Sequence, residues 1–319
     1  MKYNLKTSVP FILLLILLML TSCTQIEKGE KEQSTDDSEI VYSFENPQTN
    51  QTFKIVHVNS LFERYIEKVK DIPSHSKLDL YKEEIIQPVY SDCFENGEFI
   101  HMADVTLNKA PTSLTELKIV SELIETRKDD INALIQDALL KSAQLLPSEH
   151  DVAVCVFPSS NAQVGMYTVG AGKIIIPYNE YFDDDFIKVG VAHEYHHSSW
   201  AEKYSSNHSV SVLDNLIFEG KAVMFEKTVY PNLDFTPVDF TYNKELWSKI
   251  EPDLYKTDLN RSLEIMMGGN DLPWLYGYSE GYKMIKSYLD VNPNQSPEEW
   301  TALSTKEIIE KGKYMDNYN

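Results

Sequence analysis

The chain has 319 residues, of which 29 are basic and 49 acidic, giving a formal net charge of −20. A chain this acidic is repelled by nucleic acid and by anionic lipid headgroups, so we expect no nucleic-acid partner and no basic membrane-binding patch. Its three cysteines are too few for a framework of disulfides.

The N-terminus has the pattern of a secretory signal. Lys2 and Lys6 precede an apolar run over 11–20, which is too short to cross a bilayer as a helix. The run ends in Leu-Thr-Ser-Cys23, which resembles the lipobox of bacterial lipoproteins and implies cleavage of a signal peptide over 1–22 and lipidation of Cys23. Because the signal holds two lysines and no acid, the mature charge would be −22. We therefore expect membrane contact through the lipid anchor alone, on the extracytoplasmic face of the cell membrane.

The next part of the chain is predicted to contain a flexible tether, a hairpin and two helices. Residues 23–39 are polar and charged and cannot bury enough surface to fold. Two runs rich in strand-forming residues then flank Asn-Pro-Gln-Thr-Asn, and two runs with helical spacing follow. The strands are expected at 40–44 and 52–58, and the helices at 61–70 and 81–90, the second ended or kinked near Pro88. This hairpin and helical region is predicted to cover 40–110.

Helices and then three strands are predicted between residues 113 and 177. Ser113-Leu-Thr-Glu116 has the form of a capping box and opens a helical region that runs to about Leu146, with Asp129 and Asp130 starting a second helix. The strands are expected at 152–157, 164–169 and 173–177. An edge strand at this position could hold an extended peptide by backbone pairing.

The two cysteines left after signal cleavage are Cys93 and Cys155. Their pairing cannot be read from the sequence. Because Cys155 lies in the apolar run over 152–157, we expect it to be a small buried hydrophobic residue.

A helix over 183–200 carries the main chemical motif. Three aspartates at its start provide an N-cap and favourable charge in the first turn. Within it lies His193-Glu194-x-x-His197, in which the two imidazoles are one turn apart on the same face and can reach one ion. Glu194 projects beside them and could hold a metal-bound water, which is the H-E-x-x-H arrangement of zinc hydrolases. Gly190, one turn earlier on this face, would let another backbone come close.

A catalytic zinc ion needs a third protein ligand. The metzincin pattern fails because Trp200 and Lys203 occupy its glycine and histidine positions. The next helix, over 212–225, carries Glu219 beside an apolar stripe, where a carboxylate is costly unless it is paired or binds metal. Glu226 is its main competitor. His208, in the connecting loop, is a weaker ligand candidate, and Asp214 is expected to be a helix-terminal carboxylate or one behind the ligands. His196 is expected to be a neighbour that does not bind the metal.

The C-terminal part is predicted to be helical, at 243–254, 276–289 and 297–311, with Ser304-Thr-Lys-Glu307 capping a late helix. Three glycines are expected to permit close packing: Gly220 against the motif helix, and Gly277 and Gly281 between C-terminal helices. Tyr278 and Tyr282 are four residues apart, so both hydroxyls could point one way, and either could bind an oxyanion.

Three segments together resemble a known family: His-Glu-Tyr-His-His, Leu-Asp-Asn-Leu-Ile-Phe-Glu-Gly-Lys-Ala and Tyr-Gly-Tyr-Ser-Glu-Gly-Tyr. They resemble the YjaZ-like family of predicted zinc-dependent proteases, in outline from about 111 to 314. The Glu-Gly-x-Ala segment is also similar to the third-ligand helix of gluzincin aminopeptidases, although Lys221 replaces their usual phenylalanine. The resemblance implies that His193, His197 and Glu219 bind zinc and that Glu194 is the base.

The sequence therefore predicts an α+β, zincin-like fold with a small sheet, an active-site helix and a mostly helical C-terminal part, the metalloprotease domain covering 111–319. The expected function is a lipid-anchored zinc peptidase acting on peptides or proteins, with Zn²⁺ as its cofactor. The alternative is a lipid-anchored binding or chaperone-like protein whose zinc site is structural or degenerate.

Overall fold

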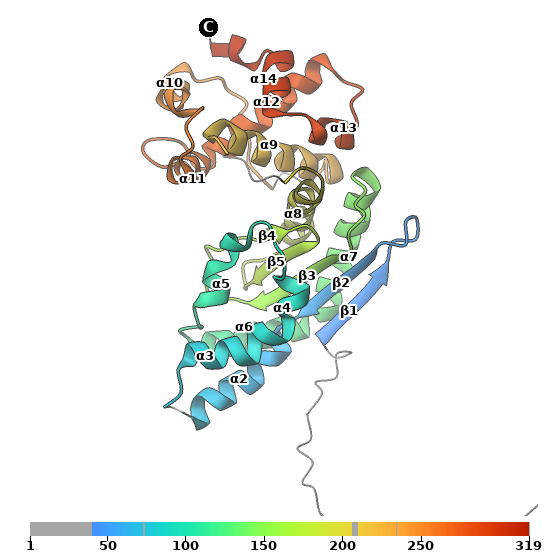
Figure 1. Cartoon of the computed structure of the whole chain (residues 1–319), viewed down its shortest axis with the longest axis vertical. Coiled ribbons are helices and arrows are strands. Elements are labelled where there is room, and N and C mark those ends of the chain that lie inside the picture. Colours follow the sequence, from blue (N-terminus) through green and yellow to red (C-terminus); the bar gives the residue numbers. More distant parts are fainter. Residues whose placement is uncertain (1–39, 73, 206–209, 234, 319) are drawn as a thin grey trace, which may run out of the picture. The chain divides into compact units, whose positions relative to one another are not determined.

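The computed structural model describes residues 40–318, apart from 73, 206–209 and 234 (Figure 1). The expected signal peptide, the lipidated Cys23, the tether and His208 lie outside the described residues. None of the described helices is long and apolar enough to cross a membrane.

A mixed five-stranded sheet lies beneath the motif helix, with strand order β1-β2-β3-β5-β4 (Figure 1). The strands are β1 (Val41–Glu45), β2 (Thr52–His57), β3 (Val152–Pro158), β4 (Tyr167–Gly170) and β5 (Lys173–Tyr178). The predicted hairpin is confirmed, since β1 and β2 pair antiparallel, and so are the three later strands. β2 and β3 pair in parallel, as do β3 and β5, so the hairpin extends the same sheet that supports the motif helix.

Both faces of the sheet are covered by helices. Side chains alternate along each strand, so the apolar strands present apolar side chains to both faces. Along β3, Val154 and Val156 belong to one buried cluster, and Cys155 and Phe157 belong to another. The first cluster includes residues of α7 and of the motif helix α8 (Asp184–Tyr204), and the second includes residues of α2 and α4. The helices before the motif are α2 (Asn59–Asp71), α3 (Lys77–Tyr81), α4 (Gln87–Cys93), α5 (Asp104–Asn108), α6 (Leu114–Thr126) and α7 (Lys128–Leu145).

The predicted helices in this part are present, with one irregularity. The helix predicted over 81–90 does not end at Pro88. A π-helical turn over Lys82–Ile86 precedes Pro88, and α4 continues beyond it to Cys93. Pro88 lies in the first turn of α4, where a missing backbone donor costs little. Ser113 caps α6 by accepting from Glu116 N, which is one of the two hydrogen bonds of the predicted capping box. Asp129 and Asp130 lie in the first turn of α7, as predicted.

Cys93 and Cys155 form a disulfide that joins the end of α4 to β3. The expectation that Cys155 is simply a small buried hydrophobic residue is therefore wrong in part: it is fully buried, but bonded. The two cysteines are 62 residues apart, and only the tertiary fold brings them together.

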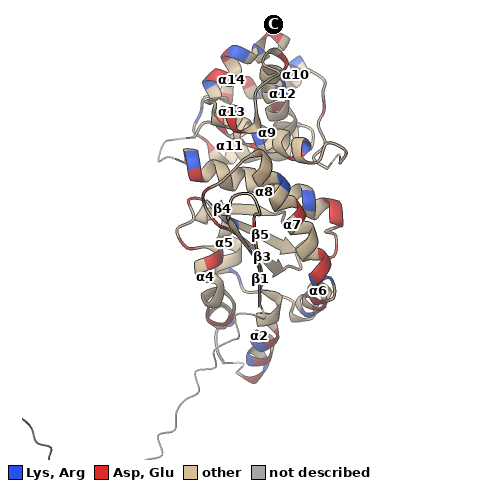
Figure 2. Cartoon of the chain, turned by 90° about the vertical axis from the view of Figure 1, so that its right-hand side faces the viewer, with Lys and Arg blue, Asp and Glu red and all other residues tan. Residues whose placement is uncertain are grey.

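The C-terminal part is mostly helical, and its outer helix faces mix acidic and basic side chains (Figure 2). Its helices are α9 (Val212–Val229), α10 (Lys244–Ile250), α11 (Leu259–Met267), α12 (Tyr276–Val291), α13 (Pro297–Ala302) and α14 (Thr305–Gly312). The predicted helix over 297–311 is two helices, because Ser304 forms a capping box with Glu307 and starts α14. Helix α11 was not predicted.

Glycines fix the position of α12 against α9. A side chain at Gly220 would collide with the backbone of Gly281, and one at Gly281 would collide with the carbonyl of Leu216. The predicted close packing at Gly281 is confirmed, but the expectation that Gly220 faces the motif helix is wrong, because its neighbour is α12. Gly277 lies in the same way against the backbone of Met266 in α11.

Candidate metal centre

Helix α8 (Asp184–Tyr204) carries the His-Glu-x-x-His motif and begins as the sequence predicts. Asp183 is its N-cap and accepts a hydrogen bond from Phe186 N, with Asp184 and Asp185 in the first turn. The expectation that Gly190 lets another backbone come close is wrong, because the side chain of Met166 lies against it, with Sδ 2.7 Å from where a Cβ would stand.

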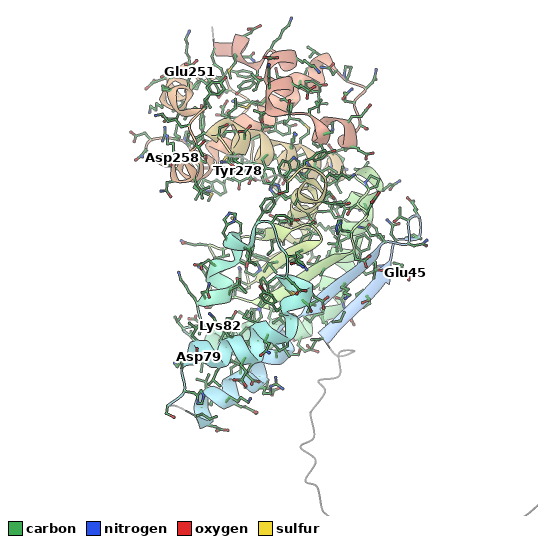
Figure 3. All side chains as sticks on the ribbon, in the orientation of Figure 1. Glu45, Asp79, Lys82, Glu251, Asp258 and Tyr278 are labelled. Atoms are coloured by element: carbon green, nitrogen blue, oxygen red, sulfur yellow. A yellow bond between two sulfur atoms is a disulfide. The ribbon has the colours of Figure 1, made fainter. Side chains whose placement is uncertain are left out.

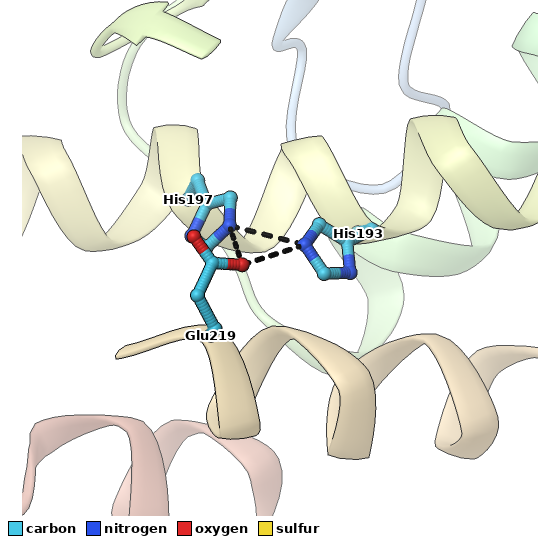
Figure 4. A group of neighbouring side chains, drawn as sticks. All are labelled: His193, His197 and Glu219. Carbon is cyan, nitrogen blue, oxygen red and sulfur yellow. Dashed lines mark hydrogen bonds and ion pairs between the residues drawn. The ribbon is translucent and has the colours of Figure 1, made fainter. Parts of the chain in front are cut away.

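His193, His197 and Glu219 converge on one point between α8 and α9 (Figure 4). The two Nε2 atoms are 3.1 Å apart, and each lies 3.3 Å from Glu219 Oε2. Among the described residues, these three are the group of His, Cys, Asp and Glu side chains that could hold a metal ion. All three are largely shielded from solvent.

The donor set fits zinc. Two imidazoles and a carboxylate are common ligands of catalytic zinc, and tetrahedral ligands about 2.0–2.1 Å from the ion are about 3.3 Å from one another. The observed separations of 3.1–3.3 Å match that spacing. The pKa of Glu219 is lowered, because the attraction of His197 and the hydrogen bonds to both imidazoles outweigh the opposing effect of burial. Glu219 is therefore an anion, which a cation site requires.

Glu226 lies behind His193. Its Oε2 is 2.9 Å from His193 Nδ1, and the residue is 1% exposed. This contact orients the imidazole so that Nε2 points to the centre, as carboxylates behind metal-binding histidines commonly do. Burial lowers the pKa of His193, but the hydrogen bonds to Glu219 and Glu226 outweigh it and hold the pKa well above its usual value.

Glu194 lies next to the cluster and is held by Thr168 of β4. Thr168 Oγ1 lies 2.9 Å from Glu194 Oε2 and 2.8 Å from the Glu194 carbonyl oxygen, so it can donate its proton to either. Both residues are buried. Thr168 carries no signal of this role in the sequence, because only the placement of the strand against the helix brings it to Glu194.

The other polar residues near the motif have different partners. His196 Nε2 lies 3.2 Å from Thr301 Oγ1, away from the cluster. Asp214 closes the capping box of α9 with Ser211, which is the helix-terminal role expected of it. Lys221 is buried and donates to the carbonyls of Thr301 and Leu303, at 2.8 and 2.7 Å.

Of the two tyrosines, Tyr278 is the one placed against the cluster. Its ring centre is 6.3 Å from that of His193, and Figure 3 shows it below α9. The charge of Glu219, together with burial and the charges of Glu194 and Glu226, raises its pKa well above the usual value, so it is a neutral hydrogen-bond donor. Tyr282 instead makes an edge contact with Phe240, with ring centres 6.0 Å apart.

An aromatic wall, also missed in the sequence, borders His197. The ring of Phe218 stacks on that of His197, with centres 4.1 Å apart, and Trp200 packs edge-on against Phe218 at 5.0 Å. Phe99, from a segment far away in the sequence, contacts the same phenylalanine at 6.1 Å.

Comparison with known proteins places part of the chain in one protein family. The model of a family described as predicted Zn-dependent proteases (DUF2268) matches residues 131–310, which include all of α8, α9 and α12. No curated protein and no solved structure matches the chain. The resemblance to a family of predicted zinc-dependent proteases is thus confirmed, and the chain belongs to this family.

Proposed function

We propose that the protein is a zinc-dependent peptidase with a zincin-like catalytic domain. The observation that carries the proposal is the convergence of His193 Nε2, His197 Nε2 and Glu219 Oε2, with Glu194 held beside them by Thr168. We assign the first three residues as zinc ligands and Glu194 as the general base. The family match supports the use of zinc and the protease activity.

The reaction would be hydrolysis of a peptide bond. Zinc, when bound, lowers the pKa of a water molecule and polarises a carbonyl group. Glu194 accepts a proton from the attacking water at its carboxylate and returns it to the leaving amine. Tyr278, neutral and facing His193, donates a hydrogen bond to the oxygen of the carbonyl under attack. Tyr282 is the less suited of the two predicted tyrosines, since it packs on Phe240.

We also propose that the protein works outside the cytoplasm, anchored by lipid on Cys23. The Leu-Thr-Ser-Cys sequence after a short apolar run supports the anchor. The Cys93–Cys155 disulfide supports the location, because disulfides persist mainly in oxidising compartments. A peptide or protein exposed at that surface would be the substrate.

Glu194→Gln tests the catalytic assignment. The change keeps size and hydrogen bonding but removes the proton acceptor, so we expect zinc content to stay the same and peptide hydrolysis to fall at least about 100-fold. Equal hydrolysis by both proteins would remove Glu194 from the mechanism. Failure of the wild type to cleave a broad peptide library would favour the alternative, a lipid-anchored binding or chaperone-like protein.

A further inference from the structure

Strand β4 is an outer strand of the sheet, and it lies directly beside the proposed base. Thr168, in the middle of this strand, holds Glu194. An outer strand presents unpaired N–H and C=O groups, and an extended peptide can pair with them as an additional strand. The free edge of β4 is therefore the natural place for a substrate of the proposed peptidase, on whose function this inference rests.

Part of that edge is already occupied. Residues 97–99, here called the edge strap, lie along the end of β4, in the segment that leads to α5 (Figure 1). Phe99 N donates to Val169 O at 2.8 Å, and Ala171 N donates to Glu98 Oε2 at 2.8 Å. Gly97 allows this approach, because a Cβ there would lie 2.6 Å from Val169 O.

The edge strap is fixed at both ends. Before it, α4 is tied to β3 by the Cys93–Cys155 disulfide. After it, Met102 N donates to Phe99 O at 2.8 Å, and Thr106 of α5 hydrogen-bonds to the Tyr167 hydroxyl at 2.6 Å. The edge strap is therefore held against β4 from both sides.

Only a short part of the β4 edge is left without a backbone hydrogen-bond partner. Within the described part of the chain, no backbone group outside the β4–β5 ladder bonds to the backbone of Tyr167 or Thr168, whereas the backbone of Val169, the next residue, is bonded to the edge strap. One residue of strand advances about 3.3 Å. Since Thr168 contacts Glu194, a bound peptide has room for only about one or two residues between the bond under attack and the strap.

The closed end of the β4 edge also carries a negative charge. Glu98 brings a carboxylate to the closed end, which favours an α-ammonium group there over a carboxylate. Antiparallel pairing, the more stable arrangement per residue, would likewise put the amino end of a substrate at the Gly170 end of β4.

We propose that the edge strap makes the enzyme cut close to the amino end of its substrate. The bond cleaved lies within about two residues of the free N-terminus, and longer amino-terminal extensions collide with residues 97–99. The strap lies outside the range that the family model matches, so this restriction belongs to the N-terminal part of the chain.

The first test uses the mature zinc-loaded protein and nested peptides. One peptide that the wild type cleaves is extended by ten residues at its amino end and, separately, by ten at its carboxyl end. We expect the amino-terminal extension to lower kcat/KM for the original bond at least about tenfold, the size of one lost hydrogen-bonded contact, and the carboxyl-terminal extension to change it little. Equal cleavage of that bond in all three peptides, or cleavage only near carboxyl ends, would overturn the proposal.

The second test moves the strap. Gly97→Ala places a Cβ against Val169 O and pushes the strap off the edge, whereas a Cβ at Gly165 would have no neighbour within 4 Å, so Gly165→Ala is the matched control. Gly97→Ala should recover cleavage of the amino-extended peptide and Gly165→Ala should not. If a zinc-loaded, folded Gly97→Ala protein favours the original peptide over the amino-extended one as strongly as the wild type does, the edge strap is not what limits the length of the amino-terminal side. Hydrolysis that is unchanged in Glu194→Gln would refute the proposed function. The nested peptides test the strap separately, because they show where the protein cuts whichever residue is the base.

Discussion

His193 Nδ1 lies 2.9 Å from Glu226 Oε2, and Glu226 is almost completely buried. The nitrogen on the other side of the same ring points to His197 and Glu219. Glu226 is therefore neither a fourth ligand nor a surface acid, but the group that sets the orientation of His193 and keeps a proton on Nδ1.

Glu226→Gln should weaken zinc binding without abolishing it. The amide cannot supply the negative charge that makes His193 a strong ligand, so we expect the affinity to fall about 10- to 100-fold. A competition titration with a zinc chelator measures this. Glu251→Gln, at an exposed residue of another helix, is the control and should bind as the wild type does. Wild-type affinity in Glu226→Gln would show that the contact is not needed.

Thr168→Val should slow hydrolysis while leaving zinc in place. Valine has a similar shape but cannot donate the hydrogen bond that holds Glu194, so kcat should fall about 10- to 100-fold. Thr168→Ser keeps the hydroxyl and should recover most of the rate. A serine variant as slow as the valine variant would mean that the hydroxyl does not position the base.

Removing the disulfide should destabilise the protein. Bonding residues 62 positions apart restricts the unfolded chain, and the loss of such a bond typically costs about 2–4 kcal/mol. The comparison is the free energy of unfolding of the Cys93→Ala, Cys155→Ala double variant against the oxidised wild type. Reduced wild type should resemble the variant. Identical stability of all three would show that the bond does not form in solution.

Cys23→Ala should release the protein from the membrane or block its processing. The prediction follows from the Leu-Thr-Ser-Cys site, since bacterial lipoproteins, by resemblance, are held by acyl chains on that cysteine. Fractionation of cells that express both forms decides it. Unchanged membrane association and processing of the variant would refute the anchor.

The sequence was most informative where local rules decide the structure. The caps and first turns of α6, α8 and α14 follow from short-range hydrogen bonding, and the spacing of His193 and His197 fixes their common face. Glu219 was favoured because a carboxylate beside an apolar stripe needs a partner, and it has two.

What the sequence could not predict depends on contacts between distant segments. Gly220 was expected to face α8, yet it faces α12, because a glycine shows that something comes close but not which element does. The same holds for the Cys93–Cys155 bond and for Phe99, whose pairing with Val169 joins segments 70 residues apart. Such relationships appear only when the sheet is assembled.

Zinc content after dialysis tests the metal centre most directly, in wild type, Glu219→Gln and Glu226→Gln measured side by side. We predict about one zinc per chain in the wild type, since the three converging atoms are close enough together to bind a single ion. Glu219→Gln, which replaces the anionic ligand, should lose the metal, and Glu226→Gln, in which all three proposed ligands remain, should retain it. Stoichiometric zinc in Glu219→Gln, or a wild type that binds none, would contradict the assignment of His193, His197 and Glu219 as the ligands.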